Sequence, residues 1–521
     1  MRLTFIILLF FWVIPSQAQD YAVDWGEMQR SNGRMVQILP DSLGNFYALR
    51  WVGGNLMGRY KVSRHENLEQ VARGSISLEV PGGIGTFEGL RLIGDRPVAF
   101  LSDKRGDTRL LFMQEYSTEL EKKGEPIQLA SYDVDKLIDR GWFDVIQSNN
   151  GKYFSVIWEI PGKKEEKDRY GFRIYDANMV EINEGDYRLP FASELSTIHG
   201  HYLSNSGDYF LSISEYKRGE RNLVFKDNRE FIALHIYHIA QDGLQDFKLD
   251  VDDRRIIAMT LSTASTDSLT VTGIYGMNDT PGVDGVFYQR IDLKNGETTM
   301  EGFRGFDKDF ITQDWSERDI LRSERREDRG RGSEPQLYNY RMREAHILED
   351  GSIVGTLEQY FVQISNTQSG QTGDFSNNYN YYYNDIIAYK IDAEEQFAWV
   401  SKIDKVQVST NDGGPYSSYE SFVADGKLNF IFNDHISNYD QNGNFIDARQ
   451  IYAANYSKRR NVVALANVDL ETGEIARKPF FDREDIDALV MPKLFNVNYR
   501  SNEVLIYAIW GRQEKFGLLR F

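Results

Sequence analysis

The stretch SNNGKYFSVIWEI at residues 148–160 joins a turn rich in Asn and Gly to a dense run of aromatic and β-branched residues. The same phrase recurs as DSLGNFYALRWV from Asp41, SNSGDYFLSIS from Ser204, EDGSIVGTLEQY from Glu349, ADGKLNFIFND from Ala424 and YRSNEVLIYAIW from Tyr499. Gly, Asn and Asp suit tight turns, and the residues that follow them favour strands. A unit that returns at intervals of tens of residues is typical of repeat architectures. We therefore predict an all-β fold made of repeated units.

The strand signals come in sets of about four, and each set predicts one four-stranded antiparallel sheet. The middle strands are almost continuously apolar, as expected of strands covered on both faces, and the outer strands are more polar. This pattern predicts a β-propeller of about eight blades, with seven as the alternative if one degenerate blade has been counted twice. The first strands of the eight sets begin near Arg34, Gly85, Trp142, Glu194, Arg254, Arg341, Tyr416 and Val490.

The last set offers only three obvious strands, between Val490 and Phe521. Residues Tyr21 to Met28 have the composition to supply the missing outer strand, and their pairing with the last set would close the ring. Closure of this kind removes exposed sheet edges. We accordingly predict a single propeller domain over residues 19–521, with loop insertions in the later blades at 306–335, 364–384 and 433–460.

The N-terminal residues 1–18 have the features of a signal peptide. Arg2 provides a positive start, Leu3 to Ile14 is apolar, and Pro15 to Ala18 has the small residues of a cleavage site. An apolar stretch this short favours cleavage over the alternative, an uncleaved anchor. We therefore predict an exported protein, periplasmic or extracellular, whose mature chain begins at Gln19.

The chain contains no cysteine and has a formal net charge of −18 at pH 7. Disulfides, cysteine nucleophiles, thiolate zinc sites and a lipoprotein anchor are thereby excluded. An acidic surface disfavours nucleic acid and anionic membranes as partners. No later segment predicts membrane insertion, and no motif predicts a cofactor.

The phrases QSNNGKYFSVIWEI, LSNSGDYFLSIS and FVADGKLNFIF resemble the turn-and-strand signature of bacterial periplasmic propellers of the TolB-like and NHL-like kinds. The resemblance covers the rhythm of most of the predicted mature chain, although its motifs are short. It implies a propeller fold and, commonly for such families, a protein-binding or scaffold role in the envelope. It assigns no catalytic residue here. The WD dipeptide is missing from these phrases, and Ser206 stands where the Asp-box of sialidases has its aspartate.

The tyrosines of SNNYNYYYND are our candidate ligand-binding residues: Tyr379, Tyr381, Tyr382 and Tyr383. Tyrosine offers a large, stiff contact surface at low entropic cost, which suits a glycan or a peptide. The alternative is a loop that folds back on its own blade or is disordered. The Arg-rich segment from Arg318 to Arg331 could bind an acidic partner, but its mixed charges are more typical of a solvated helix followed by a loop.

Three further patterns could bind metals, and in each case we favour a structural role. His199 and His201 share a strand face, yet no third ligand is identifiable, and packing between blades with hydrogen bonds to backbone explains them better. His235 and His238 are three apart and face opposite sides of a strand. The run from Asp440 to Asn444 starts like a calcium loop, but Gly443 comes two positions early, so it predicts a plain Asn-Gly turn.

No nucleophile elbow, HExxH helix or phosphate-binding loop is present in the sequence. We therefore predict a non-enzymatic propeller that binds a protein or glycan partner through its loop-bearing face, and we assign no catalytic or metal-ligating residue. One alternative is a carbohydrate-active enzyme, a glycoside hydrolase or lyase, with carboxylates at the channel mouth. A second alternative is a structural scaffold of the envelope.

Overall fold

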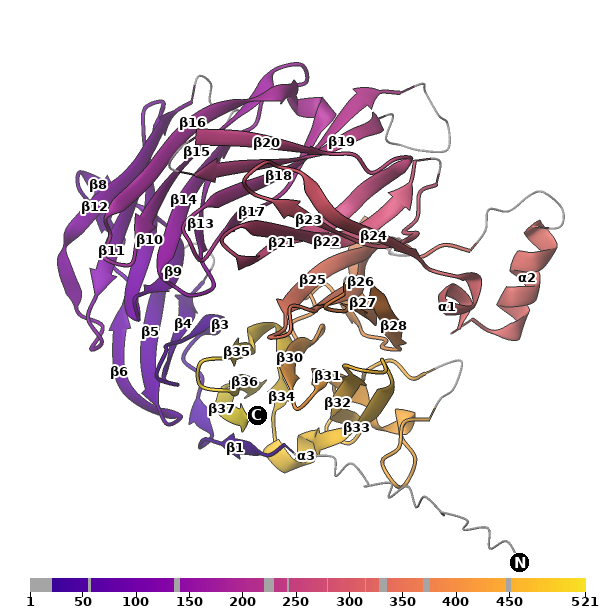
Figure 1. The fold of residues 1–521 in the computed structure, drawn as a ribbon. Helices are drawn as coiled ribbons and strands as arrows, with labels where there is room; N and C mark the ends of the chain where they lie inside the picture. The colour runs from indigo at the N-terminus through magenta and orange to yellow at the C-terminus, as the bar shows by residue number, and fades with distance from the viewer. Residues whose placement is uncertain are drawn as a thin grey trace, which may run out of the picture.

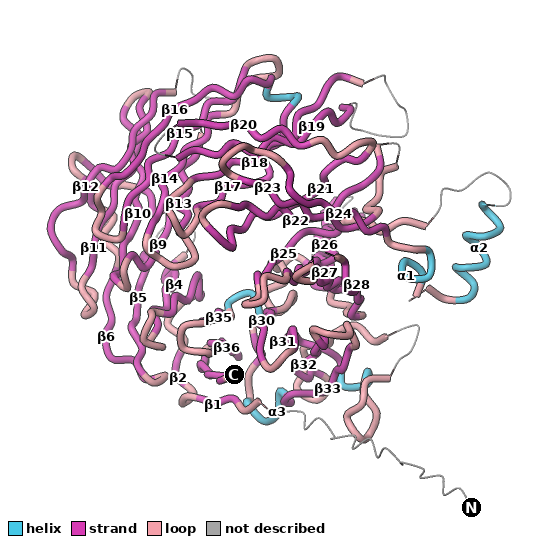
Figure 2. The backbone as a smooth tube through the Cα atoms, viewed as in Figure 1, coloured by secondary structure: helices cyan, strands magenta, loops and turns pink. Residues whose placement is uncertain are grey.

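Eight antiparallel sheets follow one another around a ring in the computed structural model of this protein (Figure 1). The structure describes residues 21–54, 58–134, 141–219, 229–240, 243–278, 280–313, 315–327, 335–368, 375–394, 396–446 and 451–521. The predicted signal peptide lies outside this part of the chain. Strands make up most of the described backbone, and helices are few and short (Figure 2). The prediction of an eight-bladed, all-β propeller is confirmed, and the seven-bladed alternative is wrong.

The first four blades each contain four strands in chain order. They are β3 (Arg34–Pro40), β4 (Phe46–Gly53), β5 (Gly58–Glu66) and β6 (Glu69–Ser75) in blade 1; β9 (Thr86–Ile93), β10 (Arg96–Arg105), β11 (Thr108–Tyr116) and β12 (Lys122–Asp133) in blade 2; β13 (Trp142–Gln147), β14 (Tyr153–Ile160), β15 (Lys167–Asp176) and β16 (Glu181–Ala192) in blade 3; and β17 (Ser196–Leu203), β18 (Tyr209–Arg218), β19 (Arg229–Ala240) and β20 (Gly243–Leu249) in blade 4. A two-stranded ribbon, β7 (Glu79–Val80) and β8 (Gly83–Ile84), joins blades 1 and 2.

The last four blades carry the additions. Their strands are β21 (Arg254–Ser265), β22 (Ser268–Met277), β23 (Gly285–Asp292) and β24 (Thr298–Gly305) in blade 5; β25 (Tyr340–Ile347), β26 (Ile353–Gln368), β27 (Phe375–Ile391) and β28 (Phe397–Ile403) in blade 6, with β29 (Val408–Thr410) paired to β27; β30 (Glu420–Ala424), β31 (Lys427–His435), β32 (Asn461–Asp469) and β33 (Ile475–Asp482) in blade 7; and β34 (Leu489–Val490), β35 (Asn496–Asn498), β36 (Glu503–Trp510) and β37 (Gln513–Arg520) in blade 8.

The remaining elements are short. They are the α-helices α1 (Lys308–Thr312), α2 (Glu317–Glu327) and α3 (Arg483–Ile486), the 3-10 helices η1 (Ser193–Leu195), η2 (Ile436–Asn438) and η3 (Pro492–Leu494), and the strands β1 (Val23–Trp25) and β2 (Gln29–Arg30).

The N-terminal strands complete blade 8, as predicted. Val23 pairs with Leu519 and Gln29 with Glu514, so β1 and β2 both lie antiparallel to β37. The first strands, β1 and β2, therefore share one sheet with the last strand, β37, and close the ring (Figure 1).

The residue types of the recurrent phrase match the hydrogen bonds of the turn that it forms. The residue that opens the turn accepts hydrogen bonds from backbone N–H groups further on: Asp41 Oδ1 from Leu43 and Asn45, and Ser204 Oγ from Ser206 and Asp208. Gly207 then adopts a φ of +92°, which a residue without a Cβ adopts easily. The apolar run that follows becomes the second strand, which neighbouring blades cover. In β14, the five residues from Phe154 to Trp158 are all buried.

The core lies between blades. Phe100 of blade 2 meets Phe154 of blade 3 with ring centroids 6.1 Å apart, in a cluster that also contains Tyr132 and Trp158. Burial of such side chains supplies about 25 cal/mol per Å² of apolar surface, and it is the main stabilising term available to a chain without disulfides.

The antiparallel blades give the ring two distinct ends. Turns between first and second strands, where the recurrent phrases begin, lie at one end, which we call the turn end. Connections from second to third strand, and from fourth strand to the next blade, lie at the opposite end, which we call the loop end.

Candidate functional site

All three predicted insertions belong to the loop end. Residues 306–335 connect β24 to β25, residues 364–384 include the end of β26 and the start of β27, and residues 433–460 include the end of β31 and lead to β32. The first contains α1 and α2, so the predicted helix is present, and the third contains η2. This one end therefore carries the surface that differs most from a minimal propeller.

The segment 364–384 is not the irregular loop that we expected. It continues β26 and β27 into a long hairpin, and β29 pairs along its other edge, with Asn380 opposite Thr410. The residues Tyr379, Tyr381 and Tyr383 alternate with Asn380 and Tyr382, and this period of two is a strand pattern that the sequence does contain.

The hairpin presents a stripe of apolar and aromatic side chains. Tyr379 lies opposite Ile364 and Tyr381 opposite Val362, and cross-strand partners project from the same face of a sheet. We call these four residues the tyrosine ridge. Exposed fractions are 41% for Tyr379, 57% for Ile364 and 38% for Val362, so much of the ridge is open to solvent.

The other two candidate tyrosines lie elsewhere on the hairpin. Tyr382 points to the opposite face, where its ring stacks on Phe361 at 4.5 Å between centroids. Tyr383 is buried, with only 5% of its surface exposed. The structure thus separates the four predicted residues into two ridge residues, one packed ring and one buried anchor.

Tyr383 joins the hairpin to blade 8 through Lys493, which is part of η3. The Lys493 ammonium donates to the Tyr383 hydroxyl at 2.6 Å and to the Gly413 carbonyl at 3.0 Å. Burial lowers the pKa of Lys493 to about 8, the carboxylate of Glu358 opposes that shift, and Arg341 adds to it. Burial also raises the pKa of Tyr383, so the phenol stays protonated.

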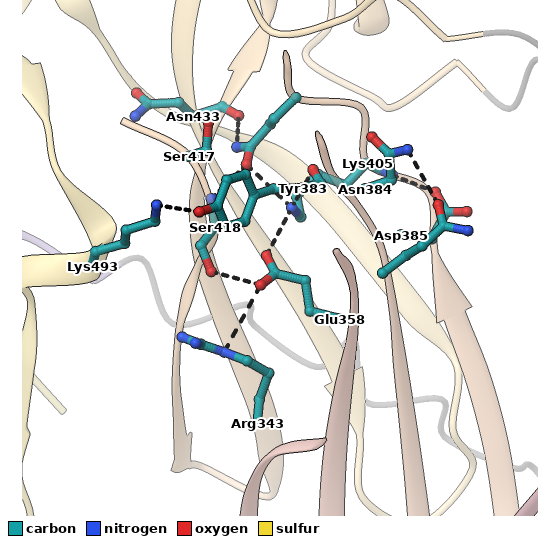
Figure 3. A network of polar contacts seen from close by, with 12 residues as sticks. Arg343, Glu358, Tyr383, Asn384, Asp385, Lys405, Ser417, Ser418, Asn433 and Lys493 are labelled. Atoms are coloured by element: carbon teal, nitrogen blue, oxygen red, sulfur yellow. Dashed lines mark hydrogen bonds and ion pairs between the residues drawn. The ribbon is translucent and has the colours of Figure 1, made fainter. Parts of the chain in front are cut away.

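Behind Tyr383 lies a buried ionic network centred on Glu358 (Figure 3). Neither Glu358 nor Lys405 exposes more than 1% of its side chain, and their charged atoms are 3.3 Å apart. Arg341 donates to Glu358 at 2.6 Å, and the Ser418 hydroxyl donates at 3.0 Å. Arg343 approaches the same carboxylate oxygen at 4.0 Å.

Lys405 and Gln407 extend the network towards blade 7. The Lys405 ammonium donates to the Tyr383 carbonyl at 2.8 Å and to Gln407 at 3.2 Å. Gln407 in turn donates to the Asn433 carbonyl at 2.8 Å, which ties blade 6 to blade 7. Burial alone would raise the pKa of Glu358, but the charges of Lys405, Arg343 and Arg341 hold it below its usual value. Glu358 is therefore ionised and enclosed.

This geometry favours binding over proton transfer at the hairpin. Glu358 is enclosed by its partners and fully buried, so it cannot contact a ligand. Its role is to hold Arg341 and, through Lys405, the backbone of Tyr383. Arg341 lies over the ring of Tyr360 at 4.2 Å, and Lys493 lies over the ring of Tyr383 at 4.0 Å. The exposed result is an aromatic ridge with cations at its base.

A second cluster joins the first strands of blades 6 and 7. Glu344 of β25 accepts from the Ser421 hydroxyl at 2.8 Å and lies 3.2 Å from His346. Burial alone would raise the pKa of Glu344, but the hydrogen bonds from His346 and Ser421 lower it below its usual value. Burial and the charge of Glu344 raise the pKa of Glu420 in β30 well above its usual value. The pKa values of two carboxyl groups on the first strands of neighbouring blades are thus shifted in opposite directions.

The histidine candidates are held inside the protein. His199 contacts the Ser214 hydroxyl at 2.7 Å, and His201 contacts Tyr209 of its own blade and Glu159 of blade 3. They pack within and between blades as expected, although their partners are side chains instead of backbone. On the opposite faces of β19, His235 contacts Asp246 at 3.0 Å and His238 contacts Gln245 at 3.4 Å.

The other two candidates have the expected local structure. Asp440 Oδ1 accepts from the backbone N–H of Asn442 and Asn444, both at 2.8 Å, and Gly443 has a φ of +79°, so this is an Asn-Gly turn. Residues Arg318 to Arg325 lie on helix α2, and the loop that completes the Arg-rich segment, residues 328–334, is outside the described residues. Within the described chain, no three His, Asp or Glu side chains are placed to hold a metal ion, and no helix could cross a membrane.

Four residues of the site were not predicted from the sequence as site residues: Arg341, Glu358, Lys405 and Lys493. Glu358 had a usable signal, since it is a lone acid within the apolar run from Ile353 to Phe361. No local sequence pattern could have identified Lys493, because its contact with Tyr383 spans 110 positions.

No protein-family model and no curated protein sequence matches this chain. Solved structures with a similar fold include the WD40 domain of SCAP from fission yeast, at a TM-score of 0.39 and 10% identity over 96% of this chain and 95% of that one. Prolyl oligopeptidase B from Galerina marginata has a TM-score of 0.38 and 10% sequence identity, over 92% of this chain and 55% of that one. The polysaccharide lyase Uly1 has a TM-score of 0.35 and 10% sequence identity, over 85% of this chain and 92% of that one.

Proposed function

We propose that this protein is an exported binding propeller whose loop end, and the tyrosine ridge in particular, docks a protein or glycan partner. The observation that carries the proposal is the position of the ridge. Exposed Tyr379, Val362 and Ile364 project from a hairpin that extends beyond its blade, at the end where the other two insertions also lie. Rigid aromatic side chains of this kind dominate the energetics of many binding surfaces.

The network around Glu358 supports the same proposal. Docking costs less when the contact surface is already ordered. The hairpin is ordered by its pairing with β29 and by the contacts of Tyr383 and Lys405. The ridge therefore lies on paired strands that are held from behind, which suits a preformed contact surface.

The test compares the Y379A/Y381A variant with the unmodified protein on a glycan array and against proteins captured from the native envelope. We expect the double variant to lose at least about tenfold in affinity for the partner that the unmodified protein binds. L43A is the matched control, because Leu43 is 79% exposed on a turn of the turn end. Equal affinity of Y379A/Y381A and the unmodified protein would refute the ridge as the contact.

A second candidate function, a carbohydrate-active enzyme, rests on Glu344 and Glu420. A pair of carboxyl groups with separated pKa values is the usual acid and base arrangement of glycoside hydrolases. Here the protonated Glu420 would be the acid, and the ionised Glu344 would be the base or nucleophile. If this is correct, a polysaccharide panel identifies a substrate whose cleavage E344Q and E420Q each reduce by about a hundredfold or more. An unchanged rate in either variant would exclude the pair.

A further inference from the structure

The side chains that line one cavity are mainly positive, although the protein as a whole is negatively charged. The cavity lies between blades 8 and 1 and has a volume of about 340 Å³. Five cations line it, Arg30, Arg50, Arg59, Lys61 and Arg73, against one acid, Glu514. The chain as a whole carries a net charge of −18, so this concentration of positive charge needs an explanation.

The register of blade 1 places these cations on one face. Arg50 of β4 pairs with Lys61 of β5, Lys61 pairs with Ser75 of β6, and Ser63 pairs with Arg73. Cross-strand partners project from the same side of a sheet, and like charges directly opposite one another are destabilising. The juxtaposition of Arg50 and Lys61 therefore has a cost in the absence of an anion.

The single acid neutralises Arg50 alone. Glu514 is 2% exposed and accepts from Arg50 at 2.7 Å and from the Tyr507 hydroxyl at 2.8 Å. Arg30, Arg59, Lys61 and Arg73 form no ion pair with any residue that the structure describes. The cavity thus keeps about four positive charges that no carboxylate of the described chain neutralises.

Arg50 is the one cation of the cavity that is held by partners among the residues that the structure describes. Its side chain is 8% exposed, and its NH1 group donates to the Ser63 hydroxyl at 2.7 Å. Its Nε is buried and has no hydrogen-bond partner. A buried N–H of a charged group costs free energy when it lacks an acceptor. This N–H is closed off from solvent, so the cations available to a ligand in the cavity are the exposed ones, Arg30, Arg59 and Arg73.

We propose that this cavity is a binding site for a small organic polyanion, a ligand with two or more carboxylate, sulfate or phosphate groups. Arginine binds these planar or tetrahedral anions in bidentate geometry, which suits Arg59 and Arg73. Gln29, Asn32, Gln70 and Ser75 also line the cavity and can hydrogen-bond hydroxyl groups of the same ligand. The volume lies in the range of ordinary small-molecule sites.

The site is at the loop end but is separate from the tyrosine ridge. Arg30 and Asn32 flank the connection from β2 to β3, Arg59 follows the connection from β4 to β5, and Ser75 ends β6. The ridge belongs to blade 6. The two proposals can therefore fail independently.

Calorimetric titration of the mature chain tests the site with four probes: inorganic pyrophosphate, a galacturonate disaccharide, a sulfated disaccharide and neutral cellobiose. We expect at least one anionic probe to bind at micromolar to millimolar concentration, cellobiose not to bind, and affinity to fall with salt. The probe that binds identifies the anionic group. Absence of binding by all three anionic probes would overturn the proposal.

The variant R59Q/R73Q removes two charged side chains that are largely exposed, so folding should be unaffected. We expect it to weaken the anionic probe by about tenfold or more. R188Q/K248Q removes two exposed charges from the outer strands of blades 3 and 4, and it should weaken the probe by less than about twofold. Equal losses in both variants would indicate general attraction and refute a built site. Y379A/Y381A should bind the probe normally.

Discussion

At the scale of single residues, the arrangement around Glu358 combines one buried carboxylate with three cations. Removal of a charged partner from such a cluster leaves the others buried without compensation. E358Q keeps the size and shape of the side chain but removes the charge opposite Lys405, which is 1% exposed. We expect E358Q to lower the free energy of unfolding by about 3 kcal/mol, measured by urea denaturation.

The matched control for this variant is E125Q, because Glu125 is exposed on β12. E125Q should change the free energy of unfolding by less than about 0.5 kcal/mol. If E358Q and E125Q unfold at the same urea concentration, the network contributes nothing to stability.

The pH dependence of E358Q follows from the lowered pKa of Glu358. The folded state binds the proton less tightly than the unfolded state, so this carboxylate contributes stability above the unfolded pKa, about 4.3. That contribution is lost as the pH falls through the folded pKa. The difference in stability between the unmodified protein and E358Q should therefore be largest near neutral pH and shrink below about pH 4. A difference independent of pH would show that charge is not the cause.

Lys493 permits a chemical test at the same scale. Its pKa of about 8 makes a substantial fraction of the amine neutral at pH 8, whereas an ordinary lysine is almost fully protonated. Limited acetylation at pH 8, read by peptide mass spectrometry, should modify Lys493 faster than Lys217, an exposed lysine paired with Glu230 at 2.9 Å. Equal rates at the two lysines would contradict the lowered pKa.

At the scale of elements, glycines opposite aromatic residues let the blades pack closely. Gly355 of β26 pairs with Tyr389 of β27, and a Cβ added to Gly355 would lie 2.2 Å from the Tyr389 ring. The Tyr389 hydroxyl is within 2.7 Å of the Thr272 hydroxyl in blade 5, so the ring cannot move without loss of that contact. The glycine is therefore part of the interface between two blades.

G355A should destabilise the protein by about 1 to 3 kcal/mol through overpacking, measured by thermal and urea unfolding. G200A is the matched control, since Gly200 is also a strand residue and a Cβ there meets no atom within 4 Å. A G355A variant as stable as G200A would mean that the hairpin adjusts without cost.

The elements also show which parts of the fold can be predicted from sequence. Arg34, Trp142 and Arg254 are predicted starts of blades and are the first residues of β3, β13 and β21. These starts depend on local signals, a turn and an apolar run. The predicted start of blade 7, Tyr416, is early, because β30 begins at Glu420.

At the scale of the whole molecule, contacts between blades limit prediction of the site. The residues that order the tyrosine hairpin come from two blades, since Arg341 and Lys405 belong to blade 6 and Lys493 to blade 8, and they lie far apart in the chain. No periodicity in the sequence encodes such contacts, because they depend on how the ring brings blades together. By contrast, closure of the ring followed from a count of strands, since the last set lacked one.

Closure is also the property of the whole ring that can be tested most directly. Trp25 of β1 packs edge-on against Phe481 at 5.5 Å, and the Tyr21 hydroxyl donates to Asp425 at 2.8 Å. A chain that begins at residue 31 lacks β1 and β2, so β37 becomes an exposed edge that favours association with other chains. We expect this chain to melt at a lower temperature, to exchange the β37 amides faster, and to form larger species in size-exclusion chromatography. A chain that begins at residue 21 is the control and should behave like the chain from residue 19. If the two truncated chains share one melting temperature and one elution volume, the N-terminal strands do not hold the ring closed.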